Sequence, residues 1–197
     1  MVNLTRNLDT PLKKHFQIYK EVLVLLGARQ VGKTTILKKI FPHAQYLSVD
    51  NEPIRKALNS YDPAVYRQIL KPNLKIIIID EIHNLADPGR AAKIFYDQLP
   101  EYQLVVTGSS ALTIKNKASE SLAGRKIEYR LFPLTFSEYL VQKEITQELS
   151  CLFLKPLAEG KKLENQNYYP FDLQSILNNT LIFGLYPGVV SYPNDQT

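Results

Sequence analysis

The feature that most constrains this chain is a glycine-containing turn between an apolar run and a segment with helical spacing. The residues "EVLVLL" (21–26) form a short apolar run that stops at Gly27, and "TTILKKIF" (34–41) places its apolar residues at helical intervals. The turn between them fits the spacing G-x-x-x-x-G-K-[ST], with Lys33 and Thr34 at the last two positions. The sequence therefore predicts a strand, a tight turn and a helix in direct succession.

A turn of this kind is predicted to hold phosphate. Its backbone N–H groups point inward, glycine removes the Cβ atoms that would block this path, and the N-terminus of the helix adds a partial positive charge. Lys33 can reach β- and γ-phosphates, and the Thr34 hydroxyl can bind Mg²⁺. We expect a nucleotide to contact Gly27, Ala28, Arg29, Gln30, Val31, Gly32, Lys33, Thr34 and Thr35.

Two acidic residues end a second apolar run. In "LKIIIID" (74–80), Asp80 closes a nearly continuous β-branched stretch, and Glu81 follows it. Side chains at the carboxyl edge of a parallel sheet face the ligand in open α/β folds. Asp80 is suited to hold Mg²⁺, and Glu81 is suited to activate a water in line with the γ-phosphate. Because a water-activating glutamate would waste nucleotide in a small-molecule kinase, this pair favours hydrolysis.

Hydroxyls and an arginine extend the predicted site. "VVTGSS" brings Thr107, Ser109 and Ser110 to the same edge, where a hydroxyl would sense the γ-phosphate or simply cap the next helix. Arg125 follows a glycine in a loop, where it would contact a phosphate of its own or a neighbouring subunit, or stay a solvated surface arginine. We include Ser109 and Arg125 with Lys33 and Glu81 in the predicted catalytic set.

The alternation of strands and helices predicts the architecture. Strands that alternate with helical segments favour a parallel sheet covered on both faces, a three-layer α/β domain, over residues 1–145. Residues 146–197 read as a linker and the incomplete start of a C-terminal domain. In that part "LAEGKKLENQNYYPF" predicts a loop, "DLQSILNNTLIFG" a helix, and "LYPGVVSYPNDQT" no closing element.

Composition excludes or disfavours several other classes of protein. The single Cys151 excludes an internal disulfide and, with three histidines, disfavours a Cys/His zinc site. The N-terminus lacks the apolar core of a signal peptide, and no segment reaches the ~20 apolar residues of a spanning helix, so we expect a cytoplasmic protein without membrane contact. The net charge of +5 permits contact with nucleic acid, but no basic patch interleaved with aromatics and no helix-turn-helix pattern supports it.

Five segments, in order, resemble one family. "GARQVGKTT", "IIIDEIHNL", "VVTGSSALTIKNKASESLAGR" and "LFPLTFSEYL" are similar to segments of the prokaryotic AAA-like ATPases that carry a C-terminal domain of unknown function. The likeness runs from Arg6 to Leu140, and "FGLYPGVV" resembles the Gly-Tyr-Pro segment with which that C-terminal domain begins. Family members usually have Gln where this chain has His83, and they are normally much longer.

The resemblance implies a P-loop fold of the additional-strand, catalytic-glutamate type, with the "VVTGSS" strand between the Asp80 strand and the P-loop strand. It also implies ATP as the nucleotide, and the chain contains no N/T-K-x-D element that would read guanine. The same roles carry over to Lys33, Thr34, Asp80 and Glu81, and the sensor role to Ser109 or Ser110. Arg125 matches the family pattern without an assigned role.

These features predict Mg²⁺-dependent binding and hydrolysis of ATP, with the nucleotide state passed to the C-terminal domain or to a partner. We expect a protein partner or self-association through the C-terminal region. Two alternatives stay open at this point: a nucleotide-gated binding switch with little turnover, and a DNA-associated motor.

Overall fold

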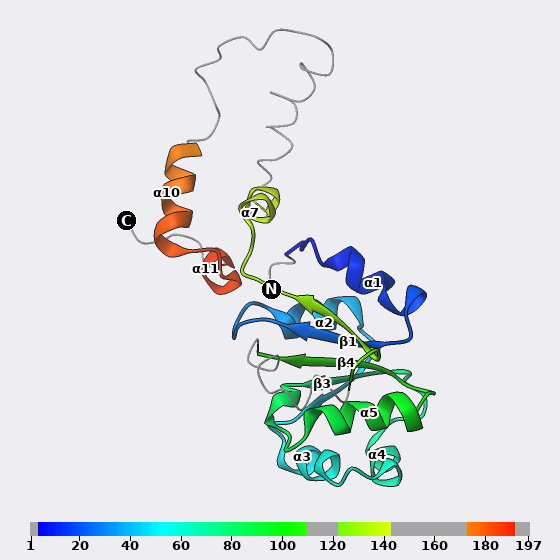
Figure 1. Cartoon of the computed structure of the whole chain (residues 1–197). Coiled ribbons are helices and arrows are strands. Elements are labelled where there is room, and N and C mark those ends of the chain that lie inside the picture. Colours follow the sequence, from blue (N-terminus) through cyan, green and yellow to red (C-terminus); the bar gives the residue numbers. More distant parts are fainter. Residues whose placement is uncertain (1–3, 110–121, 143–172, 192–197) are drawn as a thin grey trace. The chain divides into compact units, whose positions relative to one another are not determined.

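The computed structural model describes residues 4–109, 122–142 and 173–191. Within these residues the strands form one parallel sheet in the order β2-β3-β4-β1-β5 (Figure 1). The elements, in chain order, are α1 (Asp9–Ile18), β1 (Val22–Leu26), α2 (Lys33–Ile40), β2 (Gln45–Ser48), α3 (Glu52–Asn59), α4 (Pro63–Ile69), β3 (Ile76–Asp80), the 3-10 helix η1 (Ile82–Asn84), α5 (Pro88–Gln98), β4 (Gln103–Gly108), β5 (Lys126–Arg130), α7 (Phe136–Gln142), α10 (Leu173–Phe183) and α11 (Pro187–Ser191).

Helices cover both faces of the sheet, which confirms the predicted three-layer architecture (Figure 1). Successive residues of a strand point to opposite faces, so each buried strand contributes to two cores. Leu23, Leu25 and Ile78 pack with residues of α1 and α2 on one face. Val24 and Ile79 pack with residues of α3, α4 and α5 on the other face. This alternation explains why the strands β1 and β3 are apolar at nearly every position.

Two helices begin at aspartate caps followed by proline. The side chain of Asp62 accepts a hydrogen bond from the backbone N–H of Ala64 at 2.8 Å at the start of α4. The side chain of Asp87 accepts from the backbone N–H of Arg90 at 2.9 Å at the start of α5. A proline follows each aspartate, and its fixed φ suits the first helical turn.

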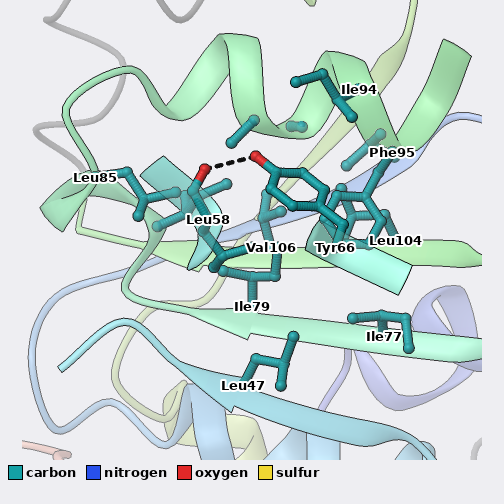
Figure 2. Packing of buried hydrophobic residues seen from close by; sticks show 14 of the residues in the cluster. Leu47, Leu58, Tyr66, Ile77, Ile79, Leu85, Ile94, Phe95, Leu104 and Val106 are labelled. Atoms are coloured by element: carbon teal, nitrogen blue, oxygen red, sulfur yellow. Dashed lines mark hydrogen bonds between the residues drawn. The ribbon is translucent and has the colours of Figure 1, made fainter. Parts of the chain in front are cut away.

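Tyr66 connects the three helices α3, α4 and α5 on one face of the sheet. Its ring stacks on Phe95 of α5 with ring centroids 5.2 Å apart, and its hydroxyl donates a hydrogen bond to the Leu58 carbonyl of α3 at 2.6 Å (Figure 2). Burial raises the pKa of the Tyr66 hydroxyl, so this group stays protonated and remains a donor. The one polar atom of a fully buried ring is therefore satisfied.

The helix α1 was not predicted. It is anchored by His15, which is fully buried, with Nε2 at 2.9 Å from the Glu21 carbonyl oxygen and Nδ1 at 3.0 Å from the Tyr129 hydroxyl. Because a carbonyl only accepts, Nε2 carries the hydrogen, and Nδ1 accepts from Tyr129. Desolvation by burial lowers the pKa of His15, which favours this neutral form.

The chain divides into two compact units, Leu8–Phe132 and the combination of Met1–Asn7 with Pro133–Thr197. The helix α7, which we placed in the first domain, therefore belongs to the second unit, and the predicted boundary at residue 145 stays a prediction. The first unit contains the sheet and the helices α1 to α5. The second unit contains α7, α10 and α11.

Glu138 explains why α7 groups with the N-terminal residues. Thr135 and Glu138 form a capping box, in which the Glu138 N–H donates to Thr135 Oγ1 at 3.2 Å and the Thr135 N–H donates to Glu138 Oε2 at 2.8 Å. The other carboxylate oxygen of Glu138 accepts from the Asn7 N–H at 2.7 Å and pairs with Arg6 Nε at 3.3 Å. The side chains of Arg6 and Glu138 are both buried. The N-terminal segment is thus bound to the start of α7.

The helix predicted within residues 172–184 is confirmed as α10, and α11 forms where no element was predicted. The predicted loop at "LAEGKKLENQNYYPF" lies outside the described residues. Among the described helices, none has the length and apolarity that a membrane span requires.

Candidate functional site

The loop between β1 and α2 forms a tight backbone turn. Gln30 and Gly32 have positive φ angles of 65° and 96°, and α2 begins directly after Gly32, at Lys33. The conformation at Gly32 is one that side chains with a Cβ rarely adopt. Val31 is fully buried in the core, so the loop is anchored by its side chain while the backbone turns outward. The predicted strand, turn and helix are confirmed.

Gly27 closes the loop against the end of the sheet. A Cβ added at Gly27 would lie 2.5 Å from the carbonyl oxygen of Leu131, which is closer than such atoms approach in folded proteins. The N–H of Leu131 donates to the Leu26 carbonyl at 2.7 Å and extends the pairing of β5 with β1. Packing therefore requires the first glycine of the motif, in addition to the predicted approach of phosphate.

The side chain of Lys33 points back into the loop between β1 and α2. Its ammonium group donates to the carbonyl oxygens of Gly27 at 2.9 Å and Ala28 at 3.1 Å, and its side chain is 7% exposed. The same ammonium lies 3.7 Å from Oε1 of Glu81. The structure therefore brings the predicted phosphate-binding lysine and the predicted catalytic glutamate together.

Asp80 occupies the carboxyl end of β3, next to two hydroxyl groups. The Thr34 hydroxyl donates to Asp80 Oδ2 at 3.4 Å, and the Thr107 hydroxyl donates to Asp80 Oδ1. Thr107 comes from β4, the strand that separates β3 from β1, as the resemblance implies. The structure thus brings the Thr34 hydroxyl and the Asp80 carboxylate together at the edge of the sheet.

Glu81 has a left-handed backbone conformation, with φ of 57°. Its N–H donates to Thr107 Oγ1 at 3.0 Å, so the fully buried Thr107 binds Asp80 through its hydrogen and Glu81 through its oxygen. The second carboxylate oxygen of Glu81, Oε2, lies 3.1 Å from Nδ1 of His83. Non-glycine residues in this conformation cluster at functional sites.

Tyr46 is a neighbour that the sequence analysis missed. It lies on β2 opposite Ile78, and its hydroxyl oxygen is buried. Burial is the main cause that raises the pKa of Tyr46; the Thr34 hydroxyl acts in the opposite direction, and the Asp80 carboxylate adds to the increase. A neutral phenol therefore borders the two predicted metal-binding residues. The only signal in the sequence was an aromatic residue with a polar tip in an otherwise ordinary strand.

The other residues of the predicted site differ in how far they are exposed and in whether the structure describes them. Ser109 is half-buried directly after β4, at the expected edge, whereas Ser110 lies outside the described residues. Thr35 and the loop residues Ala28, Arg29 and Gln30 are exposed. Their predicted contacts with nucleotide stay predictions.

Arg125 lies at the opposite edge of the sheet from the P-loop. It precedes β5, and its carbonyl accepts from the N–H of Val22, the first residue of β1, whereas the loop follows the last residue of that strand. Its guanidinium Nε lies 3.0 Å from Asp97 Oδ1, and its guanidinium lies over the Tyr96 ring at 6.0 Å. From this position Arg125 cannot contact the phosphates of a nucleotide held in the predicted site of its own chain. Of the two contacts considered from the sequence, only one with a neighbouring subunit remains a hypothesis.

The strand order, the loop and the two acids define a P-loop NTPase domain with three layers. An AAA domain family model matches residues 19–140, which is more than half of the chain, so the chain belongs to the AAA domain family. The family and the fold together make this an AAA-like P-loop ATPase domain.

Two proteins of one organism are similar to part of this chain. The chain is 31% identical over 134 residues to Uncharacterized protein MJ1637 of Methanocaldococcus jannaschii, covering 61% of this chain and 28% of that protein. It is 26% identical over 129 residues to Uncharacterized protein MJ1544 of the same organism, covering 62% of this chain and 29% of that protein. The chain thus matches less than a third of the length of these relatives.

Solved structures support the fold. The replication initiator DnaA, bound to AMPPCP and single-stranded DNA, has a TM-score of 0.54 at 14% identity, with 93% of this chain and 56% of that chain covered. A signal transduction ATPase with numerous domains, PH0952 from Pyrococcus horikoshii, has a TM-score of 0.52 at 14% identity, with 100% of this chain and 31% of that chain covered. At this identity the likeness concerns the fold alone.

Proposed function

We propose that this domain binds ATP with Mg²⁺ and hydrolyses it, with Glu81 activating the attacking water. The observation that carries the proposal is the distance of 3.7 Å between the Lys33 ammonium and Oε1 of Glu81. The lysine of a P-loop contacts the β- and γ-phosphates. A carboxylate beside that lysine therefore lies where a water approaching the γ-phosphate needs a base.

The residues present fit a magnesium ion. Mg²⁺ is usually held by one or two carboxylates together with phosphate oxygens and water, rather than by a cage of protein ligands. Thr34 and Asp80 supply two hard oxygens 3.4 Å apart, and the described residues contain no group of three or more His, Cys, Asp or Glu that would suit another metal. When bound, Mg²⁺ supplies charge that stabilises the transferring phosphoryl group.

The proposed reaction uses each residue for a separate task. Glu81 accepts a proton from the water as its oxygen bonds to the γ-phosphorus, while the bond from that phosphorus to the bridging oxygen breaks and ADP leaves. Lys33 neutralises charge on the phosphates, and loop N–H groups bind them. Ser109 is a candidate for sensing the γ-phosphate from the end of β4. Arg125 is a candidate for contact with nucleotide bound to a neighbouring subunit.

The loop also contacts the segment that leads to the second compact unit. Gly27 packs against the Leu131 carbonyl, and the chain passes to the second unit after Phe132. A shift of the loop on nucleotide binding would therefore act on the backbone close to this crossing. We propose that the nucleotide state is passed in this way to the C-terminal region, and from there to a protein partner or a second copy.

Phosphate release tests the hydrolytic assignment. We expect Mg²⁺-dependent phosphate release from ATP by the wild type, and its loss in Glu81→Gln while calorimetry shows that nucleotide binding survives. Glu101→Gln is the matched control, because Glu101 is an exposed partner of Arg67. Tight binding without turnover in the wild type would instead favour the nucleotide-gated switch.

A further inference from the structure

The turn that follows Glu81 places the side chain of His83 beside the Glu81 carboxylate. His83 lies in the middle of η1, and its Nδ1 is 3.1 Å from Oε2 of Glu81. This nitrogen is buried and has no aligned hydrogen bond to the residues that the structure describes, so its contact with Oε2 is one of proximity. About a quarter of each side chain is exposed, at 28% for His83 and 27% for Glu81. Within the described residues, Oε2 of Glu81 is the carboxylate atom that lies near it. The imidazole therefore faces the glutamate rather than the solvent at this atom.

The two oxygens of Glu81 have different partners. Oε1 faces Lys33 at 3.7 Å, but the Lys33 ammonium is closer to two loop carbonyls, at 2.9 Å and 3.1 Å. In the proposed reaction the Lys33 ammonium binds the nucleotide phosphates. Its charge is then shared between the phosphates and Glu81, so its contact with Glu81 weakens. The contact between Oε2 and His83 does not involve Lys33, so binding of phosphates to Lys33 leaves it unchanged. The contact with His83 is thus the one that can hold the carboxylate during the reaction.

The turn that presents His83 is fixed on several sides. Ile82 is 1% exposed in the core, and the Asn84 N–H donates to the Glu81 carbonyl at 3.0 Å. The Asn84 side chain donates to Asp50 Oδ1 at 3.1 Å, which connects the turn to the segment after β2. The Glu81 N–H is held by Thr107 at 3.0 Å. Both residues of the contact are therefore presented by an anchored backbone, so their separation is set by the fold.

We propose that His83 is a positioning residue for Glu81, which it orients through a hydrogen on Nδ1. This inference rests on the proposed hydrolysis and adds a residue to it. Hydrogen bonds of catalytic groups often align only when substrate is bound. An imidazole N–H that aligns in this way with one carboxylate oxygen leaves the other oxygen free to accept the proton of water. The orientation of a base affects turnover more than substrate binding, since it matters at the transition state.

Replacements of matched size separate positioning from packing. Asn places an amide nitrogen close to the position of Nδ1, whereas Leu has a similar volume without a donor. We expect His83→Leu to lower kcat by about 10-fold with KM for ATP within about twofold, as is typical when a second group that orients a reactive group is removed. We expect His83→Asn to keep kcat within about threefold of the wild type. Both variants should keep the thermal midpoint and the affinity for a non-hydrolysable ATP analogue.

The outcomes distinguish this inference from the proposed function. If the wild type releases phosphate and His83→Leu matches it in kcat, the inference is wrong and the hydrolysis stands. Equal losses in the Asn and Leu variants, or a loss confined to KM, would also overturn it. If the wild type releases no more phosphate than Glu81→Gln, the proposed function fails and the positioning role fails with it.

Discussion

The Thr34 hydroxyl lies 3.4 Å from Oδ2 of Asp80, although 46 residues separate them along the chain. One residue belongs to the first turn of α2 and the other to the last position of β3. They meet because the loop after β1 and the end of β3 open at the same edge of a parallel sheet, with β4 between the two strands. This pairing of a hydroxyl with a carboxylate is the basis of the proposed magnesium site.

Replacement of Thr34 tests that site. Thr34→Val keeps the side-chain shape but removes the oxygen, and we expect the gain in ATP affinity caused by Mg²⁺ to fall by about 10-fold or more. Thr34→Ser keeps the hydroxyl and should retain most of the gain. Calorimetric titrations of a non-hydrolysable ATP analogue with Mg²⁺ and with EDTA measure it. An unchanged magnesium effect in the valine variant would rule Thr34 out as a ligand.

Thr107 should matter for both stability and turnover. Thr107→Val leaves the Glu81 N–H without its partner and removes the donor to Asp80, so we expect a loss of about 1–3 kcal/mol in the free energy of unfolding and slower phosphate release. Thr107→Ser keeps both hydrogen bonds and should retain turnover, with a loss of about 1 kcal/mol from the missing methyl. Denaturant unfolding and phosphate release check the pair. Wild-type turnover in Thr107→Val would show that this bridge does not position Glu81.

Gly27 should tolerate no side chain. In Gly27→Ala the new Cβ would meet the Leu131 carbonyl oxygen at 2.5 Å, so the loop or the end of β5 must shift. We expect lower nucleotide affinity and a loss of about 1–3 kcal/mol in the free energy of unfolding, as for other overpacked sites. Gly188→Ala is the control, since within the described chain its Cβ would have no neighbour within 4 Å. Equal behaviour of the two variants would contradict the packing at Gly27.

The buried His15 predicts a pH dependence of stability. Burial lowers its folded pKa below the ordinary histidine value of about 6.5, so the native state binds fewer protons than the unfolded state around that pH. The stabilisation is therefore complete above the unfolded pKa of about 6.5 and is lost as pH falls from there toward the lower folded pKa.

Denaturant unfolding between about pH 5.5 and 8 should show this loss in the wild type. His15→Phe should flatten the dependence in that window, whatever its own stability. His43→Gln should leave the dependence unchanged, because His43 is exposed. A slope that survives in His15→Phe would show that other groups cause it.

Much of this site was predictable from sequence because strand ends in a parallel sheet share an edge. The motif at Lys33 and Thr34 and the acids after an apolar strand each carry a local signal, and topology brings them together. The same rule could have placed Arg125, because a residue just before a parallel strand lies at the amino edge. The prediction for Arg125 rested instead on its place in a loop after a glycine, without regard to the edge of the sheet at which that loop lies.

Other features had no readable local signal. The helix α1 uses His15 as a core residue, and a histidine breaks the apolar stripe by which a buried helix face is recognised. The Tyr46 hydroxyl comes close to Asp80 only through the register of β2 on β3, which pairing fixes in the folded chain. Likewise, the bridge from Thr107 to Glu81 depends on the positive φ of Glu81.

The most direct test of the account is the identity of the nucleotide that the protein holds after incubation with ATP and Mg²⁺. Chromatography of nucleotide extracted from the washed protein should give ADP for the wild type and intact ATP for Glu81→Gln, with little of either for Lys33→Ala. Intact ATP in the wild type as well as in Glu81→Gln would contradict hydrolysis at this site. Equal retention by Lys33→Ala would contradict the assignment of the loop itself.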